Sequence, residues 1–349
     1  MKKIISFLKT DVKIINSYFL FTIVLIILVC IGYSSYALFS FTKTSTNVIE
    51  GTVGELKKSG TDTLIKLTDN KDNSGLYTIT HAADSTLQIG ANESVTEYRY
   101  RGASPKNYVT FNNEVWRIIG IFPTDDGTGK IENRIKLIRN ESIGNKYWNT
   151  TQVSSTSSYN NWTEATLNTE LNGTYLNGLA GEAQSMIGNA KYYLGGYDGR
   201  ISSGQGFSQT SIDMYSYERK IKNTISNEFY YGTNPNSYNN KLGLIYVSDY
   251  GYASANCENK MLKRVSSSQE DLRTCVNTNW LYNIKVDEWT LSQVTSYYTV
   301  VFYATSDGYV NSNSVNYYQY AVRPVLYLKS NIKITGGNGT STNPYTLGI

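Results

Sequence analysis

Few residues in this chain could carry out catalytic chemistry. Among its 349 residues there is a single histidine, His81, which stands in the turn-like stretch "TITHAAD". Serine and cysteine nucleophiles usually depend on a histidine base, so a catalytic triad has little support. The 3 cysteines show no Cys-x-x-Cys spacing that could build a zinc site with this histidine. The sequence therefore predicts no metal site and no cofactor.

Carboxylate pairs are the remaining catalytic candidates. Asp125 with Asp126, and Asp287 with Glu288, stand in apparent turns without the apolar flanks that would raise the pKa of one partner. A glycan hydrolase could nevertheless use two carboxylates that lie far apart in the sequence. We therefore predict a non-enzymatic protein and keep a carboxylate-dependent glycan hydrolase as an alternative.

Tyrosine and asparagine offer a different kind of chemistry, namely recognition. The chain has 31 tyrosines, and several gather with asparagines in "SYYTVVFY" and "GYVNSNSVNYYQY". Tyrosine gives a large rigid contact area at low entropic cost, and asparagine gives adaptable hydrogen bonds, as in evolved binding surfaces. The alternative interpretation is an ordinary solvent face of strands, where tyrosine is simply a good β former. The ligand-binding residues that we predict are Tyr297, Tyr298, Asn311, Asn313, Asn316, Tyr317 and Tyr318.

The stretch "DGYVNSNSVNYYQYAVRPVLYL", residues 307–328, divides into two halves. From Ala321 to Leu328 apolar residues occupy both alternating positions, which is typical of a strand covered on both faces. Before Ala321 there is no apolar face that could pack against a core. We therefore expect that half to form an exposed loop or a sheet edge.

Strand-like runs must position these residues. "TEYRYRG", "NYVTF", "EVWRIIGIF" and "NRIKLIR" are separated by Pro, Asn and Gly turns, and more such runs, including "WLYN", occupy the C-terminal part. In "EVWRIIGIF" the alternation predicts Trp116 and Ile118 in the core, with Arg117 on the opposite side. "TLIKLT" and "GLYTIT" are shorter strand-like patches between residues 63 and 80.

Helical patterns are short by comparison. Leu167, Leu171 and Tyr175 are spaced i, i+4 and i+8, which predicts a helix within 161–188 with Thr163 as a possible N-cap. A second helix is expected over 217–225, and "LGLIYVSDYGYA" (242–253) is interpreted as a buried strand followed by a turn. The fold class predicted is α+β: a mostly antiparallel β domain with a few short helices.

The N-terminus has the three parts of a secretory signal. Four lysines precede the apolar run "YFLFTIVLIILVCI" (18–31), and "GYSSYA" follows, with a cut expected between Ala37 and Leu38. The competing interpretation retains this segment as a membrane anchor. Either would place the rest of the chain outside the cell. The expected organisation is a signal peptide or anchor (1–37), a β-rich stalk (38–94) and a surface domain (95–349).

The charges and cysteines agree with an exported protein. Lys and Arg exceed Asp and Glu by 4, and most of this excess lies before residue 38, so no basic stripe remains for nucleic acid. In an exported chain Cys257 and Cys275 are expected to form a disulfide, worth about 3 kcal/mol. Two free thiols in a reducing compartment are the alternative.

Two stretches carry resemblances to known bacterial proteins. The export segment resembles that of camelysin-type and biofilm-fibre proteins of Gram-positive bacteria, at Tyr36, Ala37, Phe39, Asn47, Gly51, Thr52 and Leu56. Residues 95–349 resemble a surface domain of gut Firmicutes and Mollicutes that has no assigned activity, most clearly at "WRII" and "VRP". That domain is distantly similar in plan to the C-type-lectin-like group. The resemblance implies a bacterial surface or matrix setting, and no catalytic residue is carried over.

These observations together predict a secreted or cell-surface protein that acts in adhesion or recognition. Its expected partner is a glycan or a surface protein, with membrane contact through the N-terminal segment before or without cleavage. A structural subunit of a surface fibre or biofilm matrix is the second alternative, besides the hydrolase.

Overall fold

The chain divides into two units, residues Met1–Lys57 and Lys58–Ile349, each described by itself. In the first unit, residues 21–23 and 25–28 are helical. Among the described residues, no helix has the length and apolar character needed to cross a membrane. The predicted cut after Ala37 lies outside them. The computed structural model describes residues 21–23, 25–28, 58–69, 74–151, 159–197, 210–221, 229–263 and 275–349.

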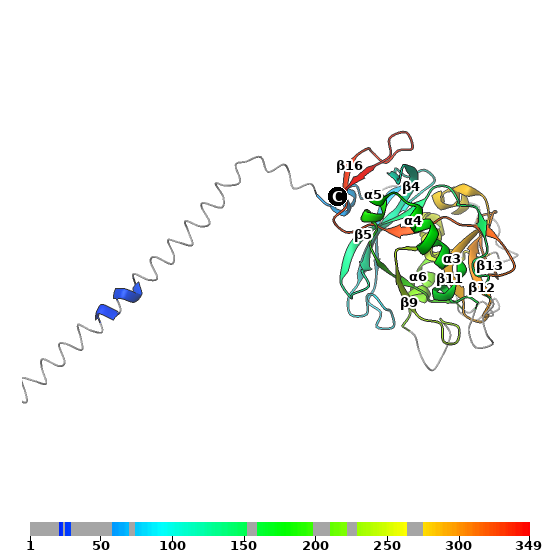
Figure 1. Cartoon of the computed structure of the whole chain (residues 1–349), viewed down its shortest axis with the longest axis horizontal. Coiled ribbons are helices and arrows are strands. Elements are labelled where there is room, and N and C mark those ends of the chain that lie inside the picture. The colour runs from blue at the N-terminus through cyan, green and yellow to red at the C-terminus, as the bar shows by residue number, and fades with distance from the viewer. Residues whose placement is uncertain are drawn as a thin grey trace, which may run out of the picture. The chain divides into compact units, whose positions relative to one another are not determined.

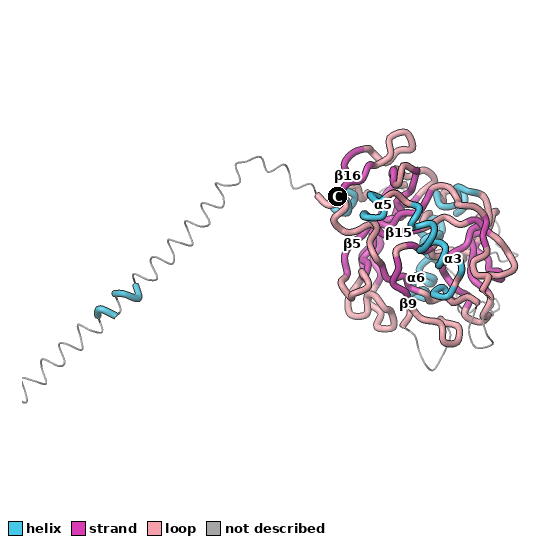
Figure 2. Tube along the Cα trace, in the orientation of Figure 1, coloured by secondary structure: helices cyan, strands magenta, loops and turns pink. Residues whose placement is uncertain are grey.

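Figures 1 and 2 show strands and short helices gathered together in the second unit. Among the described residues, its larger sheet has seven strands in the order β1-β2-β4-β5-β15-β10, and β3 pairs with β4 outside this path. Every pairing in this sheet is antiparallel. Its strands are β1 (Gly75–His81), β2 (Val95–Arg101), β3 (Tyr108–Phe111), β4 (Glu114–Asp125), β5 (Ile131–Arg139), β10 (Leu242–Gly243) and β15 (Val325–Tyr327).

A second sheet of six strands has the order β13-β12-β11-β14-β6, with β8 beside β11. Strand β11 pairs antiparallel with β12 but parallel with β14 and β8. The mixed α+β, mostly antiparallel architecture that was predicted is therefore confirmed. The strands are β6 (Asn145–Lys146), β8 (Gly196–Tyr197), β11 (Glu288–Val294), β12 (Val300–Ala304), β13 (Val310–Ser314) and β14 (Tyr320–Ala321), besides the pairs β7 (Ala190–Tyr193) with β9 (Ser237–Asn240) and β16 (Lys333–Gly336) with β17 (Thr346–Gly348).

The helices of the second unit are short. In the stretch predicted as one helix, Leu167 and Leu171 are buried as expected, but the chain forms several successive turns. The predicted cap was wrong, because Asn161 accepts the Thr163 N–H at 3.1 Å and α3 begins only at Thr166. The helical segments are α2 (Gly60–Ile65), η2 (Trp162–Glu164), α3 (Thr166–Glu170), the π-helix η3 (Leu171–Tyr175), α4 (Leu176–Gly178), α5 (Gly181–Met186), α6 (Ser211–Arg219), α7 (Val247–Tyr252), η4 (Ala255–Cys257) and η5 (Trp280–Ile284).

Several predicted elements differ from the structure for local reasons. In 242–253 the strand β10 ends after two residues and α7 follows, because Asp249 accepts the Tyr246 N–H at 3.0 Å and closes the helix start. Helix α6 begins earlier than the predicted 217–225, where Thr210 caps it, and includes residues 217–219; residues 222–225 lie outside the described part of the chain. Helix α2 replaces the strand expected in "TLIKLT", with Ser59 as its cap, and "WLYN" forms η5 rather than a strand.

Residues 58–94 belong to the same compact unit as the rest of the domain. Strand β1 pairs along its whole length with β2, from Gly75 opposite Arg101 to His81 opposite Val95. The boundary expected at residue 94 thus falls between two strands of one antiparallel pair. The local pattern could not reveal this pairing, because thirteen residues (82–94) separate the two strands.

Strand β4 shows how the larger sheet is covered. Trp116 and Ile118 are fully buried, as predicted, while Val115 is exposed. Arg117, expected on the opposite side, is buried there too: its Nε donates to Asn107 at 2.7 Å, and its guanidinium lies 3.7 Å from the centre of the Tyr108 ring. Burial lowers the pKa of Arg117 to about 10. The sheet is therefore covered on both faces at this point.

The stretch around Pro324 connects the two sheets. Tyr320 and Ala321 form β14 in the six-stranded sheet, whereas Val325 begins β15 in the seven-stranded sheet. The single strand predicted from Ala321 onward is thus two strands, although its residues are buried as expected. Arg323, at the crossing, donates to both carboxylate oxygens of Glu288 at 2.8 and 2.7 Å.

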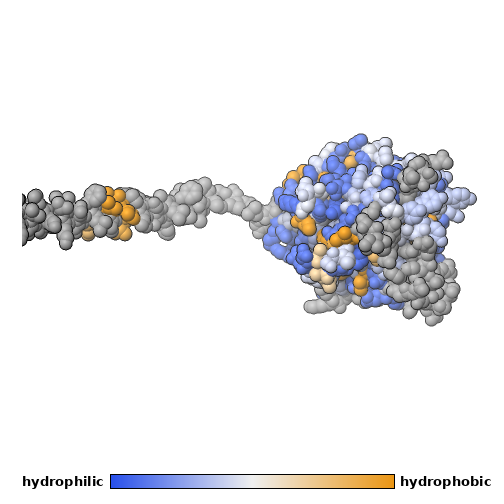
Figure 3. Space-filling model, turned by 90° about the horizontal axis from the view of Figure 1, so that it is seen from below, coloured by the Kyte–Doolittle hydropathy of each residue, from blue (hydrophilic) through white to orange (hydrophobic). Residues whose placement is uncertain are grey.

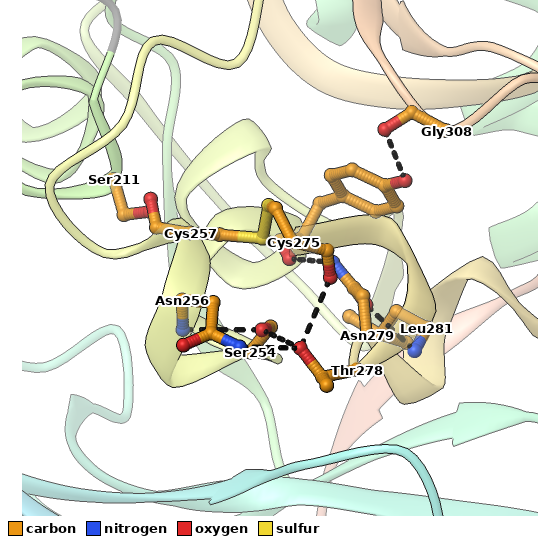
Figure 4. Close-up of a disulfide and its surroundings, with 10 residues drawn as sticks. Ser211, Ser254, Asn256, Cys257, Cys275, Thr278, Asn279, Leu281 and Gly308 are labelled. Carbon is orange, nitrogen blue, oxygen red and sulfur yellow. Dashed lines mark hydrogen bonds between the residues drawn. A yellow bond between two sulfur atoms is a disulfide. The ribbon is translucent and has the colours of Figure 1, made fainter. Parts of the chain in front are cut away.

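The disulfide predicted between Cys257 and Cys275 is present, with the two Cα atoms 5.0 Å apart (Figure 4). Around it, Thr278 contacts Ser254 at 2.6 Å and accepts from Asn256 at 3.2 Å. These bonds tie η4 to the turn before η5.

Removing this cross-link with Cys257→Ser and Cys275→Ser together should lower the free energy of unfolding by about 2–4 kcal/mol, because the unfolded chain regains loop entropy. Urea denaturation of both proteins measures the difference. Alkylation of the unreduced, unfolded wild type should leave both cysteines unlabelled, with a reduced sample as the labelling control. Labelling of both without reductant would contradict the bond.

Candidate ligand-binding face

A column of aromatic rings forms on the six-stranded sheet. Trp289 of β11 and Tyr303 of β12 are cross-strand partners, and Tyr320 of β14 lies beside both, with ring centres 4.5 and 4.4 Å away. The Tyr318 ring stacks on Tyr320 at 5.9 Å, and Tyr317 meets Tyr318 edge-on at 5.0 Å. We call these five residues the ring column. Its rings come from three strands and the segment that follows β13.

The ring column runs from the core to the surface. Trp289 is fully buried and donates its indole N–H to the Lys146 carbonyl at 2.8 Å. Tyr303 is also buried, whereas Tyr318 and Tyr317 are 41% and 75% exposed. The buried rings fix the position of the outer ones, so the exposed rings are held before any ligand arrives. Such preorganisation lowers the entropic cost of binding.

Strand β13 borders the column with asparagines. Asn313 donates from Nδ2 to the Tyr320 hydroxyl at 2.8 Å. Asn311, exposed, faces Tyr303 across the strand pair. Asn316, also exposed, accepts a hydrogen bond from Ser314 at 2.9 Å. The structure thus brings Asn311, Asn313, Asn316, Tyr317 and Tyr318 of the predicted site to one edge of the sheet.

The remaining predicted residues are Tyr297 and Tyr298, and the Tyr298 ring belongs to a second group of rings. Both residues lie in the turn between β11 and β12, and each is about half exposed. Tyr298 has Tyr159 and Tyr231 as ring neighbours, with centres 6.0 and 6.1 Å away. We call Tyr159, Tyr231, Tyr297 and Tyr298 the turn cluster.

Buried amides hold the turn cluster in place. The Asn160 side chain donates to the carbonyls of Val294, Tyr297 and Val300 at 2.9–3.1 Å. Asn234 in turn donates to the Asn160 side chain at 3.0 Å. Because both amides are buried, water does not compete for these bonds, and the turn has one geometry.

The charges around the ring column are few. Burial raises the pKa of both Tyr303 and Tyr320, and the Asp287 carboxylate adds to each rise. Lys146 pairs with Tyr320 across the strands, but its ammonium is bound by Glu170 at 2.7 Å. None of the cation–ring contacts found in the described parts of the chain involves the ring column or the turn cluster. The Asp287 carboxylate is thus the charge identified next to Tyr303 and Tyr320.

A second group of chemically interesting residues lies in the core and forms a chain of ion pairs. Arg99 donates from Nη1 to Asp249 at 2.8 Å and from Nε to Glu97, and Lys136 contacts the other oxygen of Asp249. These side chains are at most 2% exposed. His81, expected in a turn, instead ends β1 and contacts Glu97 at 3.0 Å.

Burial and ion pairing shift the pKa values of Asp249 and Lys136 in this polar core. Burial acts to raise the pKa of Asp249, but Lys136 and Arg99 hold it below its usual value. Burial lowers the pKa of Lys136 to about 8, although Asp249 opposes the shift. Each carboxylate of this chain of ion pairs has a cationic partner inside the core, and these side chains are almost fully withdrawn from the surface.

The surface also contains hollows away from the ring column. One of about 700 Å³ lies between α2, β1 and the β16–β17 pair, with Leu76, Tyr100 and Tyr345 among its lining residues. The face of the compact unit shown in Figure 3 is mostly hydrophilic, with small separate apolar patches. None of the residues predicted to bind a ligand lines this hollow.

Comparisons with known proteins add no relative, because no family model, no curated protein and no solved structure matches the chain. The resemblances to a bacterial surface domain, to camelysin-type export segments and to the C-type-lectin-like plan therefore remain predictions. The function of the site therefore has to be inferred from its own residues.

Proposed function

We propose that this protein is a non-enzymatic recognition protein of the bacterial cell surface that binds glycans through the ring column. The observation that supports this most directly is that the exposed fraction of the rings increases along the column, from fully buried Trp289 to Tyr317 at 75%. Aromatic rings that are exposed but held in place stack on the apolar faces of sugars, and neighbouring amides and hydroxyls bond their polar groups. A surface protein is the alternative ligand.

The core carboxylates lend little support to the hydrolase alternative. A glycosidase needs two carboxyl groups that flank the scissile bond in an accessible cleft. Glu97, Asp249 and Glu288 are at most 2% exposed and are bound by arginine or lysine side chains. Recognition needs no such pair, so it accounts better for the arrangement.

The outer edge of β13 argues against the fibre alternative at this strand. Strand donation requires unpaired backbone groups along an exposed edge. Since the Val315 N–H points inward to Thr299, the N–H groups of Val310, Ser312 and Ser314 point outward. Each of these three has a partner at 2.9 Å: the Leu262 carbonyl, the Asn311 side chain and the Asn313 side chain, respectively. The edge is closed by its own chain.

The extracellular setting rests on the N-terminal sequence. A basic region, an apolar run and small residues before Leu38 are typical of an export signal or anchor. The disulfide agrees with an oxidising compartment. Both features support a place outside the cytoplasm for residues 58–349.

The test replaces the two exposed rings of the column. Tyr317→Ala and Tyr318→Ala should each weaken glycan binding by about 1–2 kcal/mol, because each removes stacking area from a fixed surface. The wild-type protein is screened on a glycan array, and the best oligosaccharide is then titrated by calorimetry against each variant. Melting curves should stay close to that of the wild type, since both rings are exposed.

Ile131→Ala is the matched control, because Ile131 is 55% exposed on the other main sheet and should leave affinity unchanged. Equal affinity of wild type and both tyrosine variants would reject the ring column as the site. A large loss of stability in those variants would show that the rings belong to the core. Binding to surface proteins but to no glycan would favour the alternative ligand.

A further inference from the structure

We infer that the ligand is a linear, uncharged oligosaccharide that extends from the ring column to the turn cluster. This inference rests on the proposed function and adds the length and charge of the ligand. It follows from the way the two groups of rings are joined and from the charges around them.

The two groups meet at the open end of the β12–β13 pair. Val300 lies opposite Ser314, and the Val315 N–H donates to the Thr299 carbonyl at 2.8 Å. Tyr298 immediately precedes this last rung on one strand, and Asn316 immediately follows it on the other. Neighbouring strands are about 5 Å apart, so the backbones of the two segments adjoin.

A single sugar ring that stacks on one tyrosine engages only one of the two groups. The turn cluster offers Tyr297 and Tyr298, and the ring column offers Tyr317 and Tyr318, each between 41% and 75% exposed. A ligand that touches both must reach from the turn before β12 to the segment after β13, which requires a chain of sugar units. Asn316, exposed at the junction, can bond hydroxyls between the two stacking places.

Both stacking places are preformed, so a long ligand gains from the second contact without first ordering the protein. The amide network of Asn160 and Asn234 fixes the turn, and Trp289 and Tyr303 fix the column. Linking two contacts in one ligand makes the second contact intramolecular and raises the overall affinity. Affinity should therefore grow with chain length until both groups are engaged.

The surroundings favour an uncharged ligand. Asp287 lies beside β14, where its carbonyl accepts the Ala321 N–H at 2.8 Å, and the nearby Lys146 is bound by Glu170 at 2.7 Å. The Asp287 carboxylate also adds to the raised pKa of Tyr303 and Tyr320. An acidic sugar, such as a uronate or a sialic acid, would bring a second negative charge toward the Asp287 carboxylate. Such a like-charge contact costs affinity.

The experiment titrates the full-length protein with neutral glucose and N-acetylglucosamine oligosaccharides, from monosaccharide to hexasaccharide, and with oligouronates of equal length. For the neutral series we expect affinity to rise at least about tenfold from disaccharide to hexasaccharide. Tyr298→Ala should weaken hexasaccharide binding about tenfold and leave disaccharide binding unchanged, whereas Tyr318→Ala should weaken both. Tyr298→Phe, which keeps the ring, should bind like the wild type.

The outcomes separate this inference from the proposed function. Affinity that is independent of length, or insensitive to Tyr298→Ala at every length, would overturn the extended site while leaving glycan recognition intact. Tighter binding of oligouronates would overturn the uncharged ligand alone. Binding of no oligosaccharide, here or on the array, would reject the proposed function together with the inference.

Discussion

Asp249→Ala is expected to lower the free energy of unfolding by about 3–5 kcal/mol, because it removes the single acid between two buried cations. In the wild type, Asp249 accepts from Arg99 at 2.8 Å and contacts Lys136, and all three side chains are at most 1% exposed. Without the carboxylate, Lys136 keeps no acidic partner among the described residues. Urea denaturation followed by tryptophan fluorescence measures the loss.

Two further variants show whether the loss comes from buried charge. Lys136→Met combined with Asp249→Ala should cost less than the sum of the single changes, since the stranded ammonium is gone. Glu170→Ala, which breaks the surface pair with Lys146, should change stability by no more than about 1 kcal/mol. An Asp249→Ala protein that unfolds at the wild-type urea concentration would mean that these charges are solvated.

Trp116→Ala should cost about 3–5 kcal/mol, because the indole fills space in the core that alanine leaves empty. Trp116 is fully buried on β4 and packs edge-on against Phe111, with ring centres 5.3 Å apart. Thermal and urea unfolding of the variant both report this loss. A melting temperature equal to that of the wild type would show that the strand face was misassigned.

Neighbouring changes on β4 serve as controls for the tryptophan. Val115→Ala, one residue away and 43% exposed, should stay within about 0.5 kcal/mol of the wild type. Trp116→Phe should cost less than Trp116→Ala, since phenylalanine keeps a packed ring. It also removes the indole N–H, which has no hydrogen-bond partner among the described residues.

Local patterns predicted the parts of the fold that local forces decide. The alternation in "EVWRIIGIF" placed Trp116 and Ile118 in the core, where both are fully buried. The same patterns failed where a tertiary contact competed. In "LGLIYVSDYGYA" the apolar run is typical of a strand, but Asp249 caps α7 and pairs with Arg99 and Lys136 from the larger sheet. A sequence pattern carries no signal for partners on other strands.

The candidate site likewise combines residues that local patterns predict with residues that only tertiary contacts bring together. Tyr317 and Tyr318 could be predicted as exposed, because no apolar residues beside them could form a packed face. Trp289, Tyr303 and Tyr320 were missed, since the antiparallel pairing of β11 with β12 and the parallel pairing of β11 with β14 together bring them side by side. Tyr159 and Tyr231 come from two further segments and join Tyr298 only in three dimensions.

The closed edge of β13 affects how the protein behaves at high concentration. Exposed strand edges recruit other chains into shared sheets, and this is a common start of aggregation in crowded conditions. Here the side chains of Asn311 and Asn313 accept hydrogen bonds from the outward N–H groups of Ser312 and Ser314. Many copies can therefore stand side by side without their β13 strands pairing, so the exposed Tyr317 and Tyr318 need not be covered by a neighbouring copy.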